Sequence, residues 1–334
     1  MATGTRYPIP YVGSKRRLVR WIMESIPQDA KTVFDAFSGS GAVAYALKKS
    51  GHRVIANDRL RYCHHIARAI IENDTVRLTD DEIDALIADN PDAGTFVRDH
   101  FDGVFFEPGV HRLIDMIRAN VDRFSGYKRD IALAALGRAC ASGKKGFTYF
   151  HSTPAHIPGD TPERFRARVA ETAGWLNSMV IDTGARCEAH RADIMDILPR
   201  VKADLAYFDP PYATEFDTHN YEKDNHFVEG LMIYWDGLKI RMNTKGRYYE
   251  TDHTTVTRTN CHAFFSSLLS RSTHIPRWRI SYRDRAYPRV HEIVSMAEAL
   301  GMTATVKDIE HTYSIAGSRR GAREILVMCD RANG

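Results

Sequence analysis

The stretch "TVFDAFSGSGAVAYALKKSGHRVIAND", residues 32–58, decides the fold class. "TVFDAF" has the composition of a short buried strand, "SGSG" of a turn, and "AVAYALKKSG" of a helix that ends at Gly51. "RVIAND" is the next strand, and it ends in Asn57 and Asp58. Strand, helix and strand in this order predict one parallel crossover unit of an α/β sheet.

The rest of the chain divides into a helical part and a second α/β part. Helices are predicted in "RYCHHIARAIIEND", "DDEIDALIAD", "GVHRLIDMIRANVDRF", "KRDIALAALGRACAS" and "PERFRARVAETAGWLNSMV". Strands return at "LAYFDP", "WRISYR", "ATVKDI" and "EILVMCD", and a loop between the last two predicts an antiparallel pair. We therefore expect an α/β domain made of residues 1–59 and 186–334, interrupted by a helical insertion at 60–185 with one hairpin near 137–150.

Composition sets broad limits on the 334 residues. Hydrophobic residues make up 43% and charged residues 26%, which is ordinary for a soluble globular protein. No apolar run is long enough to cross a bilayer, and the start "MATGTRYPIP" lacks the apolar core of a signal peptide, so we expect a cytoplasmic protein. The five cysteines are scattered without a C-x-x-C pair, which favours buried reduced thiols and no metal site.

The glycine-rich turn is the first candidate ligand site, because ligands bind parallel sheets at the carboxyl ends of strands. Gly39 and Gly41 allow a sharp turn and a close approach by a ligand. Ala44 replaces the third glycine of the dinucleotide fingerprint, which disfavours a dehydrogenase. Asp58 suits a ribose with free hydroxyls, whereas Asp35 disfavours a diphosphate and suits a cation or an amino group. A plain strand–helix turn is the alternative.

The stretch "YVGSKRRL", residues 11–18, is a Gly-Ser turn before three basic residues that open a helix. One interpretation is a surface helix cap made by Ser14, with the charges solvated. The other is that Lys15 leaves the turn to pair with a ligand carboxylate.

The stretch "LAYFDPPYA", residues 205–213, ends a strand abruptly, because proline has no N–H for the ladder and fixes its backbone angle. Asp209 and the Pro210 carbonyl could accept the two N–H bonds of an exocyclic amino group on a base. They would also stabilise the positive charge that develops as this nitrogen attacks a methyl group. Tyr212 would stack on the ring. A structural turn is the alternative for any one of these residues, but the combination favours methyl transfer.

"YVGSK", "DAFSGSG", "ND" and "DPPY" follow one another in an order that resembles the α-class (Dam-like) DNA adenine-N6 methyltransferases. The resemblance covers most of the chain. It implies a Rossmann-like, S-adenosylmethionine-dependent methyltransferase fold interrupted by a mainly helical DNA-recognition domain. It also implies site-specific methylation of adenine N6 in double-stranded DNA, with the base flipped out of the duplex and with no metal.

The resemblance assigns site residues of three kinds. The catalytic residues would be Asp209, Pro210, Pro211 and Tyr212. The residues around S-adenosylmethionine would be Tyr11, Lys15, Asp35, Phe37, Gly39, Gly41, Asp58, Asp193 and Asp209. The DNA-binding residues would be Arg138, Lys144, Lys145, Arg283 and Arg285. Gly137 and Ser142 replace two asparagines that typical members have in the recognition segment, so base contacts are not carried over.

Several alternatives and partners follow from the same residues. Cytosine-N4 or RNA adenine methylation would need a similar amino-group site, and a catalytically inactive DNA-binding relative is the non-enzymatic alternative. We expect a monomer that binds double-stranded DNA; a cognate restriction endonuclease would act without a stable complex.

Residues 213–260 are predicted to form a long loop region with short elements, and "NYEKDNHFVEGL" is expected to close over the flipped base.

Overall fold

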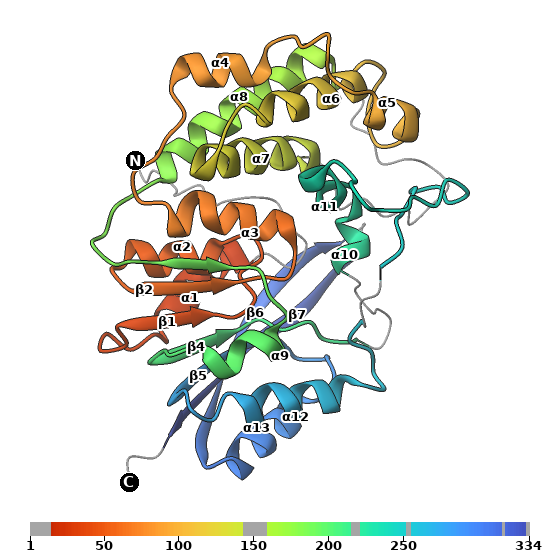
Figure 1. The fold of residues 1–334 in the computed structure, drawn as a ribbon. Coiled ribbons are helices and arrows are strands. Elements are labelled where there is room, and N and C mark those ends of the chain that lie inside the picture. The colour runs from red at the N-terminus through yellow and green to blue at the C-terminus, as the bar shows by residue number, and fades with distance from the viewer. Residues whose placement is uncertain (1–14, 143–158, 215–220, 252–254, 316–317, 332–334) are drawn as a thin grey trace.

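The computed structural model describes residues 15–142, 159–214, 221–251, 255–315 and 318–331. In these residues one sheet of seven strands has the order β3-β2-β1-β4-β5-β7-β6 (Figure 1). The strands are β1 Thr32–Asp35, β2 Arg53–Asn57, β3 Glu188–His190, β4 Leu205–Phe208, β5 Arg277–Arg283, β6 Met302–Ile315 and β7 Ser318–Arg331.

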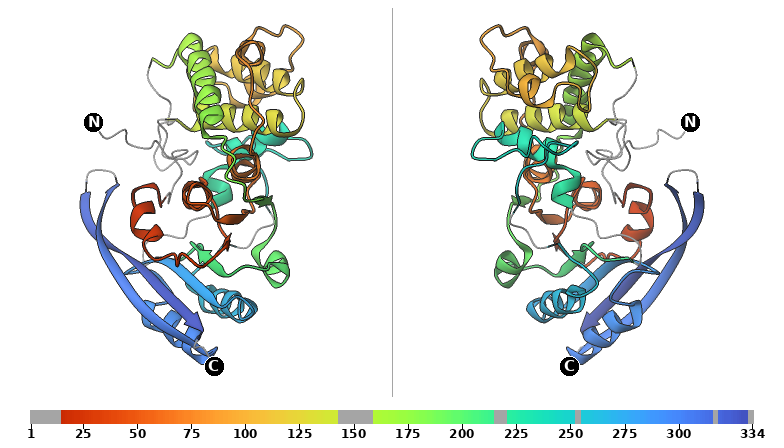
Figure 2. Two further views of the ribbon diagram at one scale, coloured as in Figure 1. Left: turned by 90° about the vertical axis from the view of Figure 1, so that its left-hand side faces the viewer. Right: turned by 90° about the vertical axis from the view of Figure 1, so that its right-hand side faces the viewer.

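The directions of the strands confirm the predicted α/β fold. The pairs from β3 to β5 are parallel, while β7 runs antiparallel to both β5 and β6. The last strand of the chain is therefore the antiparallel one, as predicted, but it lies between β5 and β6 rather than at the edge of the sheet. Figure 2 shows the β6–β7 hairpin curving along one side of the molecule.

Helices cover both faces of the sheet, which explains why its central strands are continuous apolar runs. Val33 and Leu205 point into one core, with residues of α1, α2 and α3. Phe34 and Phe208 point into the other, with residues of α9, α12 and α13. The short helices next to the sheet are η1 Lys15–Arg17, α1 Val19–Met23, α2 Ala42–Lys49, α3 Arg61–Ala67, η2 Arg68–Glu72, α9 Ile194–Ile197, η3 Leu198–Arg200, α12 Cys261–Arg271 and α13 Val290–Ala299.

A second layer of helices stands above α2 and α3 in Figure 1. It contains α4 Asp80–Ile87, α5 Phe96–Phe101, α6 Val110–Val121, α7 Gly126–Ala141 and α8 Pro162–Met179. α7 contacts α3, and a Cβ on Gly137 would come within 2.6 Å of the Tyr62 ring. Gly137, which stands where typical members of the resembled family have asparagine, thus allows α7 to pack closely against α3. The division at 1–59, 60–185 and 186–334 stays a prediction.

Part of the predicted recognition hairpin is helical. α7 continues to Ala141, so Gly137 and Arg138 lie inside a helix rather than in a hairpin. The helix predicted in "KRDIALAALGRACAS", residues 128–142, is therefore confirmed, and only the predicted start of the hairpin near residue 137 overlaps with it. Lys144 and Lys145 lie outside the described residues.

The segment after the proline turn contains a buried helix. α10 spans Tyr221–Asp224 and α11 spans His226–Ile233. Phe227 is in the core shared with the helical layer, and Glu229 is 1% exposed. The Glu229 carboxylate accepts the N–H groups of Arg61 and Tyr62 at 2.9 and 2.8 Å, and thereby caps the N-terminus of α3. This part of "NYEKDNHFVEGL" therefore packs two layers together.

We expect Glu229→Gln to lower the free energy of unfolding by about 1–3 kcal/mol, because an amide cannot accept both buried N–H groups. Urea unfolding measures the change. Glu171→Gln makes the same chemical change at an exposed position of α8 and should leave the midpoint unchanged. Equal stability of the two variants would contradict a capping role for Glu229.

Candidate active site

The sheet brings polar residues of three strands onto one face. Asp35 of β1 pairs with Tyr207 of β4, and Tyr207 pairs with Arg279 of β5. Paired residues share a face, and Asp209 follows Tyr207 by two positions, so it continues this face beyond the end of β4. β1 lies between β2 and β4, where the strand order reverses, which is the usual ligand position in open α/β sheets.

Lys15 and Asp209 form a buried ion pair at this place. The Lys15 Nζ lies 2.8 Å from the Asp209 Oδ1, and the two side chains are 7% and 19% exposed. Burial raises the pKa of Asp209, while the Lys15 ammonium opposes that rise. Burial likewise opposes the charge on Lys15, but Asp209 and Glu324 outweigh it and the pKa of Lys15 is raised. Lys15 was expected near a ligand carboxylate; the structure places it on the carboxylate of Asp209.

Asp35 is a buried carboxylate without a cation of its own among the described residues. It is 1% exposed, and its Oδ1 accepts no hydrogen bond from them. Burial, followed by the charges of Asp209 and Asp58, raises the pKa of Asp35 to about 8. A cationic ligand group next to this oxygen would stabilise the ionised carboxylate and lower its pKa.

Asp58 shapes the glycine turn. Its Oδ2 accepts the Gly39 N–H at 2.8 Å, and its Oδ1 accepts the Leu60 N–H at 2.9 Å. Gly39 and Gly41 have φ values of 49° and 73°, in the left-handed region that favours glycine. Burial raises the pKa of Asp58 to about 6. The backbone of Arg59 and the side chain of Cys63 also form hydrogen bonds with this carboxylate.

The remaining residues predicted around the methyl donor are spread around this turn. Phe37 is half-buried against the second core. Asp193 is exposed, accepts the Met195 N–H as the N-cap of α9, and lies 3.9 Å from Arg59. Tyr11 lies outside the described residues.

The proline turn is held rigidly against the end of β5. Pro210 is buried and Pro211 half-buried. The Ala213 carbonyl accepts the Tyr287 N–H at 2.8 Å, which closes an isolated antiparallel bridge. The half-buried Tyr212 ring meets Tyr282 edge-on, at 5.3 Å between centroids and 67° between planes. The turn is thus fixed before any base arrives.

The arginines of the basic stretch "PRWRISYRDRAYPR", residues 276–289, lie in different environments. Arg277 binds Asp29 with two hydrogen bonds of 2.7 Å, and the buried Arg279 donates to the Ser25 carbonyl and to Asp330. These two arginines therefore hold the fold together. Further along, Arg283 ends β5 beside the site and Arg285 is 85% exposed.

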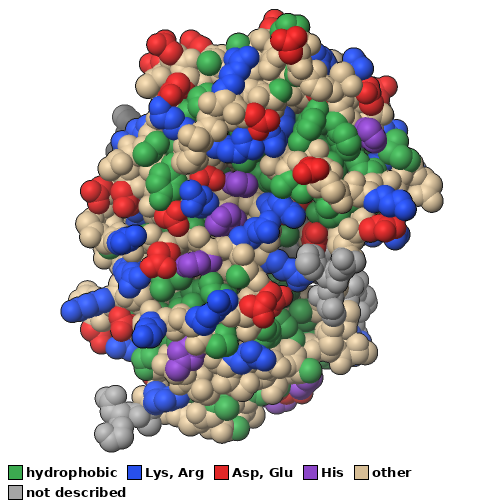
Figure 3. Space-filling model, in the orientation of Figure 1, with side chains coloured by type: hydrophobic (Ala, Val, Ile, Leu, Met, Phe, Trp, Pro, Cys, Tyr) green, Lys and Arg blue, Asp and Glu red, His purple; other side chains and the backbone are tan. Residues whose placement is uncertain are grey.

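Arg138 and the surface in Figure 3 give little support to one broad basic patch. The Arg138 guanidinium stacks on the Trp175 ring at 4.4 Å, between α7 and α8. On the face shown in Figure 3, Lys and Arg side chains are mixed with Asp and Glu. DNA contacts by Arg138, Arg283 and Arg285 stay predictions.

Glu324 is a site residue that sequence reasoning missed. It lies on β7 opposite Arg283, is fully buried, and raises the pKa of Lys15 through its charge. Burial raises its own pKa to about 7. It begins the stretch "EILVMCD", where a glutamate reads as the solvated start of a strand, and only the pairing with β5 reveals its position.

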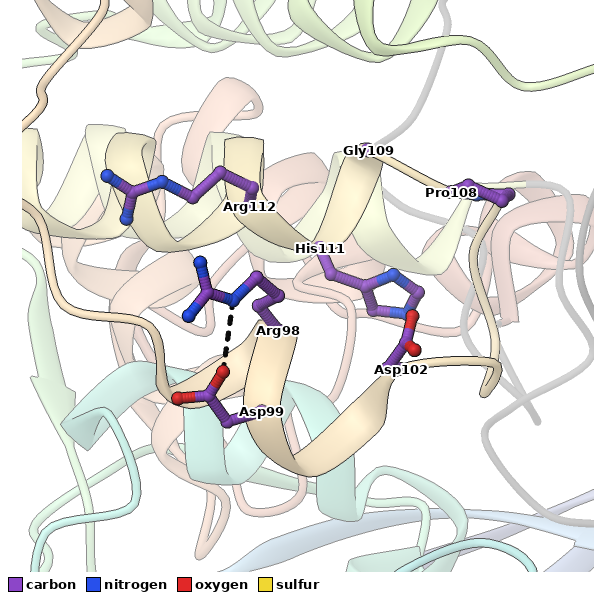
Figure 4. Close-up of a pocket in the computed structure, with 7 residues that line it drawn as sticks. All are labelled: Arg98, Asp99, Asp102, Pro108, Gly109, His111 and Arg112. Atoms are coloured by element: carbon purple, nitrogen blue, oxygen red, sulfur yellow. Dashed lines mark hydrogen bonds and ion pairs between the residues drawn. The ribbon is translucent and has the colours of Figure 1, made fainter.

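A surface hollow of about 480 Å³ lies away from this site, between α5 and α6 (Figure 4). The Arg112 guanidinium already donates to the carbonyls of Ala93 and Gly94, and Arg98 donates to Asp99. Arg112 therefore connects α6 to the segment that precedes α5.

The sequence also led to expectations about the cysteines, metal binding and membrane-spanning helices. All five cysteines are buried and none forms a disulfide, as predicted. In the described part of the chain, no cluster of His, Cys, Asp and Glu has an arrangement for a metal ion. None of the described helices has the length and apolar character needed to span a membrane.

A mostly parallel, Rossmann-like sheet with a glycine turn and a D-P-P-Y turn at its switch point defines a methyltransferase fold. The family model of the D12 class N6 adenine-specific DNA methyltransferases matches residues 11–274, and the chain belongs to this family. It is an adenine-specific DNA methyltransferase, which uses a methyl donor and acts on DNA. This result disfavours the cytosine-N4, RNA and non-enzymatic alternatives.

Curated relatives agree with the family. The chain is 27% identical over 345 residues to the type II methyltransferase M2.HphI of Haemophilus parahaemolyticus, covering 97% of this chain and 98% of the relative. It is 21% identical to the type II methyltransferase M.NlaIII of Neisseria lactamica, over 68% of this chain and 70% of that one. It is 25% identical to the type II methyltransferase M.CviAII of Paramecium bursaria Chlorella virus 1, over 64% and 67%.

The buried carboxyls predict how stability changes with pH. The pKa of Asp35 is about 8 and those of Glu229 and Glu324 about 7, all above their ordinary values. A carboxyl with a raised pKa binds its proton more tightly in the folded protein, so folding is favoured at low pH and loses stability as pH rises through that pKa. We expect the free energy of unfolding to fall between about pH 5 and pH 8, measured by urea unfolding at a series of pH values. A constant or rising free energy over this range would contradict the prediction.

Proposed function

We propose that the enzyme transfers a methyl group from S-adenosylmethionine to N6 of an adenine that is flipped out of double-stranded DNA at a specific sequence. The observation that carries the proposal is the Lys15–Asp209 pair, which lies at the end of β4 on the same face as the unpartnered oxygen of Asp35. A methyl donor and a target amino group would meet between these two carboxylates.

The residues around the glycine turn fit the chemistry of S-adenosylmethionine. When bound, this donor supplies a methyl group on a cationic sulfur. The buried Asp35 Oδ1 would accept a hydrogen bond from the ammonium of its amino acid part, which would lower the raised pKa of Asp35. Asp58, at the end of β2 beside the glycine turn, would bind the ribose hydroxyls, and Asp193 would contact the adenine ring of the donor.

Asp209 and Pro210 would hold the reacting nitrogen. Its lone pair is delocalised into the ring, so it is a weak nucleophile. The Asp209 carboxylate and the Pro210 carbonyl would accept its two N–H bonds and stabilise the positive charge that develops on it. As the new N–C bond forms and the bond from the methyl carbon to sulfur breaks, Asp209 would take the released proton and pass it to water.

Target recognition would use the rigid turn and the basic residues that follow β5. A base inside the duplex cannot reach Asp209, so it must be flipped out. Tyr212 would stack on that base, with Tyr282 behind it. Arg285, which is 85% exposed, would contact backbone phosphate, as would Arg283 and Lys144 and Lys145. Arg138, which stacks on Trp175, would hold α7 in place for DNA binding by a recognition domain of residues 60–185.

The biological setting belongs to the same proposal. The relatives are named type II methyltransferases, which supports a role in restriction-modification beside a cognate endonuclease with no stable complex between the two. We place the enzyme in the cytoplasm, acting as a monomer.

The test is methyl transfer with an isotope-labelled donor. Purified protein is incubated with unmethylated duplex DNA and S-adenosylmethionine carrying a labelled methyl group, and the digested nucleosides are analysed by mass spectrometry. Label in N6-methyldeoxyadenosine is expected, and sequencing then locates the modified site. Label in the cytosine product, or in RNA alone, would overturn the proposed substrate. Equal labelling of every adenine would overturn sequence specificity.

A further inference from the structure

Two arginines stack on one tyrosine beside the proline turn. The guanidinium carbon of Arg258 lies 4.4 Å from the centre of the Tyr287 ring, and that of Arg289 lies 4.0 Å from it. The Arg289 guanidinium also donates to the Tyr287 hydroxyl at 2.8 Å. Arg258 comes from the loop before α12 and Arg289 from the residue before α13, so one ring brings together charges from two different loops.

Both charges lie at the edge of the sheet where methyl transfer is proposed. α12 connects the parallel strands β4 and β5, and α13 follows β5, so both helices begin at the carboxyl ends of these strands. The two helices contact each other below β5 in Figure 1. Since Arg258 and Arg289 come just before these helices, they lie at the same edge as Asp209.

The tyrosine also connects the arginines to the proline turn. Its backbone N–H donates to the Ala213 carbonyl at 2.8 Å. Ala213 directly follows Tyr212, the ring that is proposed to stack on the flipped base. The stacked arginines are therefore next to the position of the target nucleotide.

The loop that carries Arg258 is held by its own hydrogen bonds. The Asn260 side chain accepts the Thr257 N–H at 2.7 Å and donates to the Thr255 carbonyl at 2.9 Å. The Cys261 thiol donates to the Arg258 carbonyl at 3.4 Å. With the backbone fixed by this loop and the side chain by the ring, Arg258 loses little conformational entropy when it binds a ligand.

Neither guanidinium pairs with a carboxylate of the residues that the structure describes. The carboxylate of Glu292 instead accepts the backbone N–H of Arg289 at 2.5 Å and lies 3.1 Å from the His262 ring nitrogen. Two like charges held on one ring repel each other, so an anion beside them is stabilised by both.

We propose that Arg258, Tyr287 and Arg289 form a binding site for the DNA backbone, which holds the phosphates next to the flipped adenine. This inference rests on the proposed flipping of the target base. Guanidinium groups bind phosphate through two parallel hydrogen bonds, and stacking on the ring fixes the orientation of their planes. Because a phosphate carries no sequence information, the site positions the target strand and does not select the sequence.

Loss of either charge should change how DNA binding depends on salt. In Arg258→Gln and in Arg289→Gln we expect the Kd for duplex DNA to rise about fivefold at about 0.15 M salt. The slope of log K against log salt concentration should fall in magnitude by about 1. Arg258→Lys keeps the charge and should restore most of the slope. Fluorescence anisotropy at a series of salt concentrations measures both quantities.

Arg271→Gln is the matched control, because Arg271 is exposed at the opposite end of α12. It should keep the wild-type slope. An unchanged slope in both test variants, or an equal fall in the control, would overturn the proposal. Arg258 is exposed, so its variant decides the matter even if Arg289→Gln fails to fold.

Neutral methylphosphonate linkages locate the contact on the DNA. After labelled methyl transfer has identified the target adenine, one linkage is placed beside it or, as a control, one helical turn away. The adjacent linkage should weaken binding by the wild type about fivefold and hardly affect the double variant Arg258→Gln, Arg289→Gln, in which the partner charges are already missing. Equal losses in both proteins would overturn the proposal. The expected salt slopes in a protein that labels no adenine would instead refute the proposed methyl transfer alone.

Discussion

Replacing Asp209 by alanine should reduce methylation by about 10³-fold while the affinity for S-adenosylmethionine stays close to that of the wild type. The variant loses the acceptor that orients the amino group and stabilises its developing charge. The donor is expected to bind mainly around Asp35 and the glycine turn, whose hydrogen bonds to Asp58 do not involve Asp209. Labelled methyl transfer measures the first quantity and titration calorimetry the second.

Two further variants make the Asp209 result specific. Asp209→Asn keeps the shape of the side chain but presents N–H groups to an amine, so it should also be inactive. Asp196→Ala removes an exposed carboxylate from α9 and should keep full activity. Activity within tenfold of the wild type in both Asp209 variants would remove Asp209 from the mechanism.

Lys15→Met should reduce methylation at neutral pH by about 100-fold, with partial recovery in alkaline solution. Methionine fills a similar volume without the charge. The Lys15 ammonium lowers the pKa of both Asp209 and Glu324, so its loss raises both. A protonated Asp209 is a weaker acceptor for the amino group and cannot take the released proton, and its deprotonation then requires a higher pH. The measurement is kcat against pH.

Arg16 provides the matched control for Lys15. It occupies the same turn of η1 but is exposed, so Arg16→Met should leave the pH profile unchanged. The same loss of activity in Lys15→Met at every pH would mean that Lys15 acts on a ligand, such as the donor carboxylate, rather than on the ionisation of Asp209.

Local patterns in the sequence predicted the features that depend on neighbours in the chain. The unit from Thr32 to Asp58 was readable because two apolar runs and a glycine turn specify strand, helix and strand without reference to other segments. The proline turn was readable for the same reason. The antiparallel pairing of the last two strands was also predictable, because the sequence between them has the character of a loop rather than of a helix.

Features that depend on distant pairing were not predictable. Glu324 is buried only because β7 lies beside β5, and Arg279 is buried only because α1 covers that face. From the sequence of an isolated strand, charged residues of this kind are predicted to lie on the surface. Phe227 and Glu229 were placed in a loop because their segment lacks clear periodicity, although α11 is buried on nearly all sides between two layers.

The order of the strands has a consequence for how the protein forms during translation. The backbone N–H of Thr32 on β1 binds the side chain of Asp204, 172 residues later, and β4 follows at once. β1 and β2 therefore leave the ribosome long before the neighbour that completes the centre of their sheet. The helical layer is synthesised in that interval and can fold through local contacts, whereas closure of the sheet must wait. Asp35 is synthesised before the helical layer and Asp209 after it. A nascent chain that ends within the helical layer would therefore contain Asp35 and the glycine turn but not Asp209, and it could not methylate DNA.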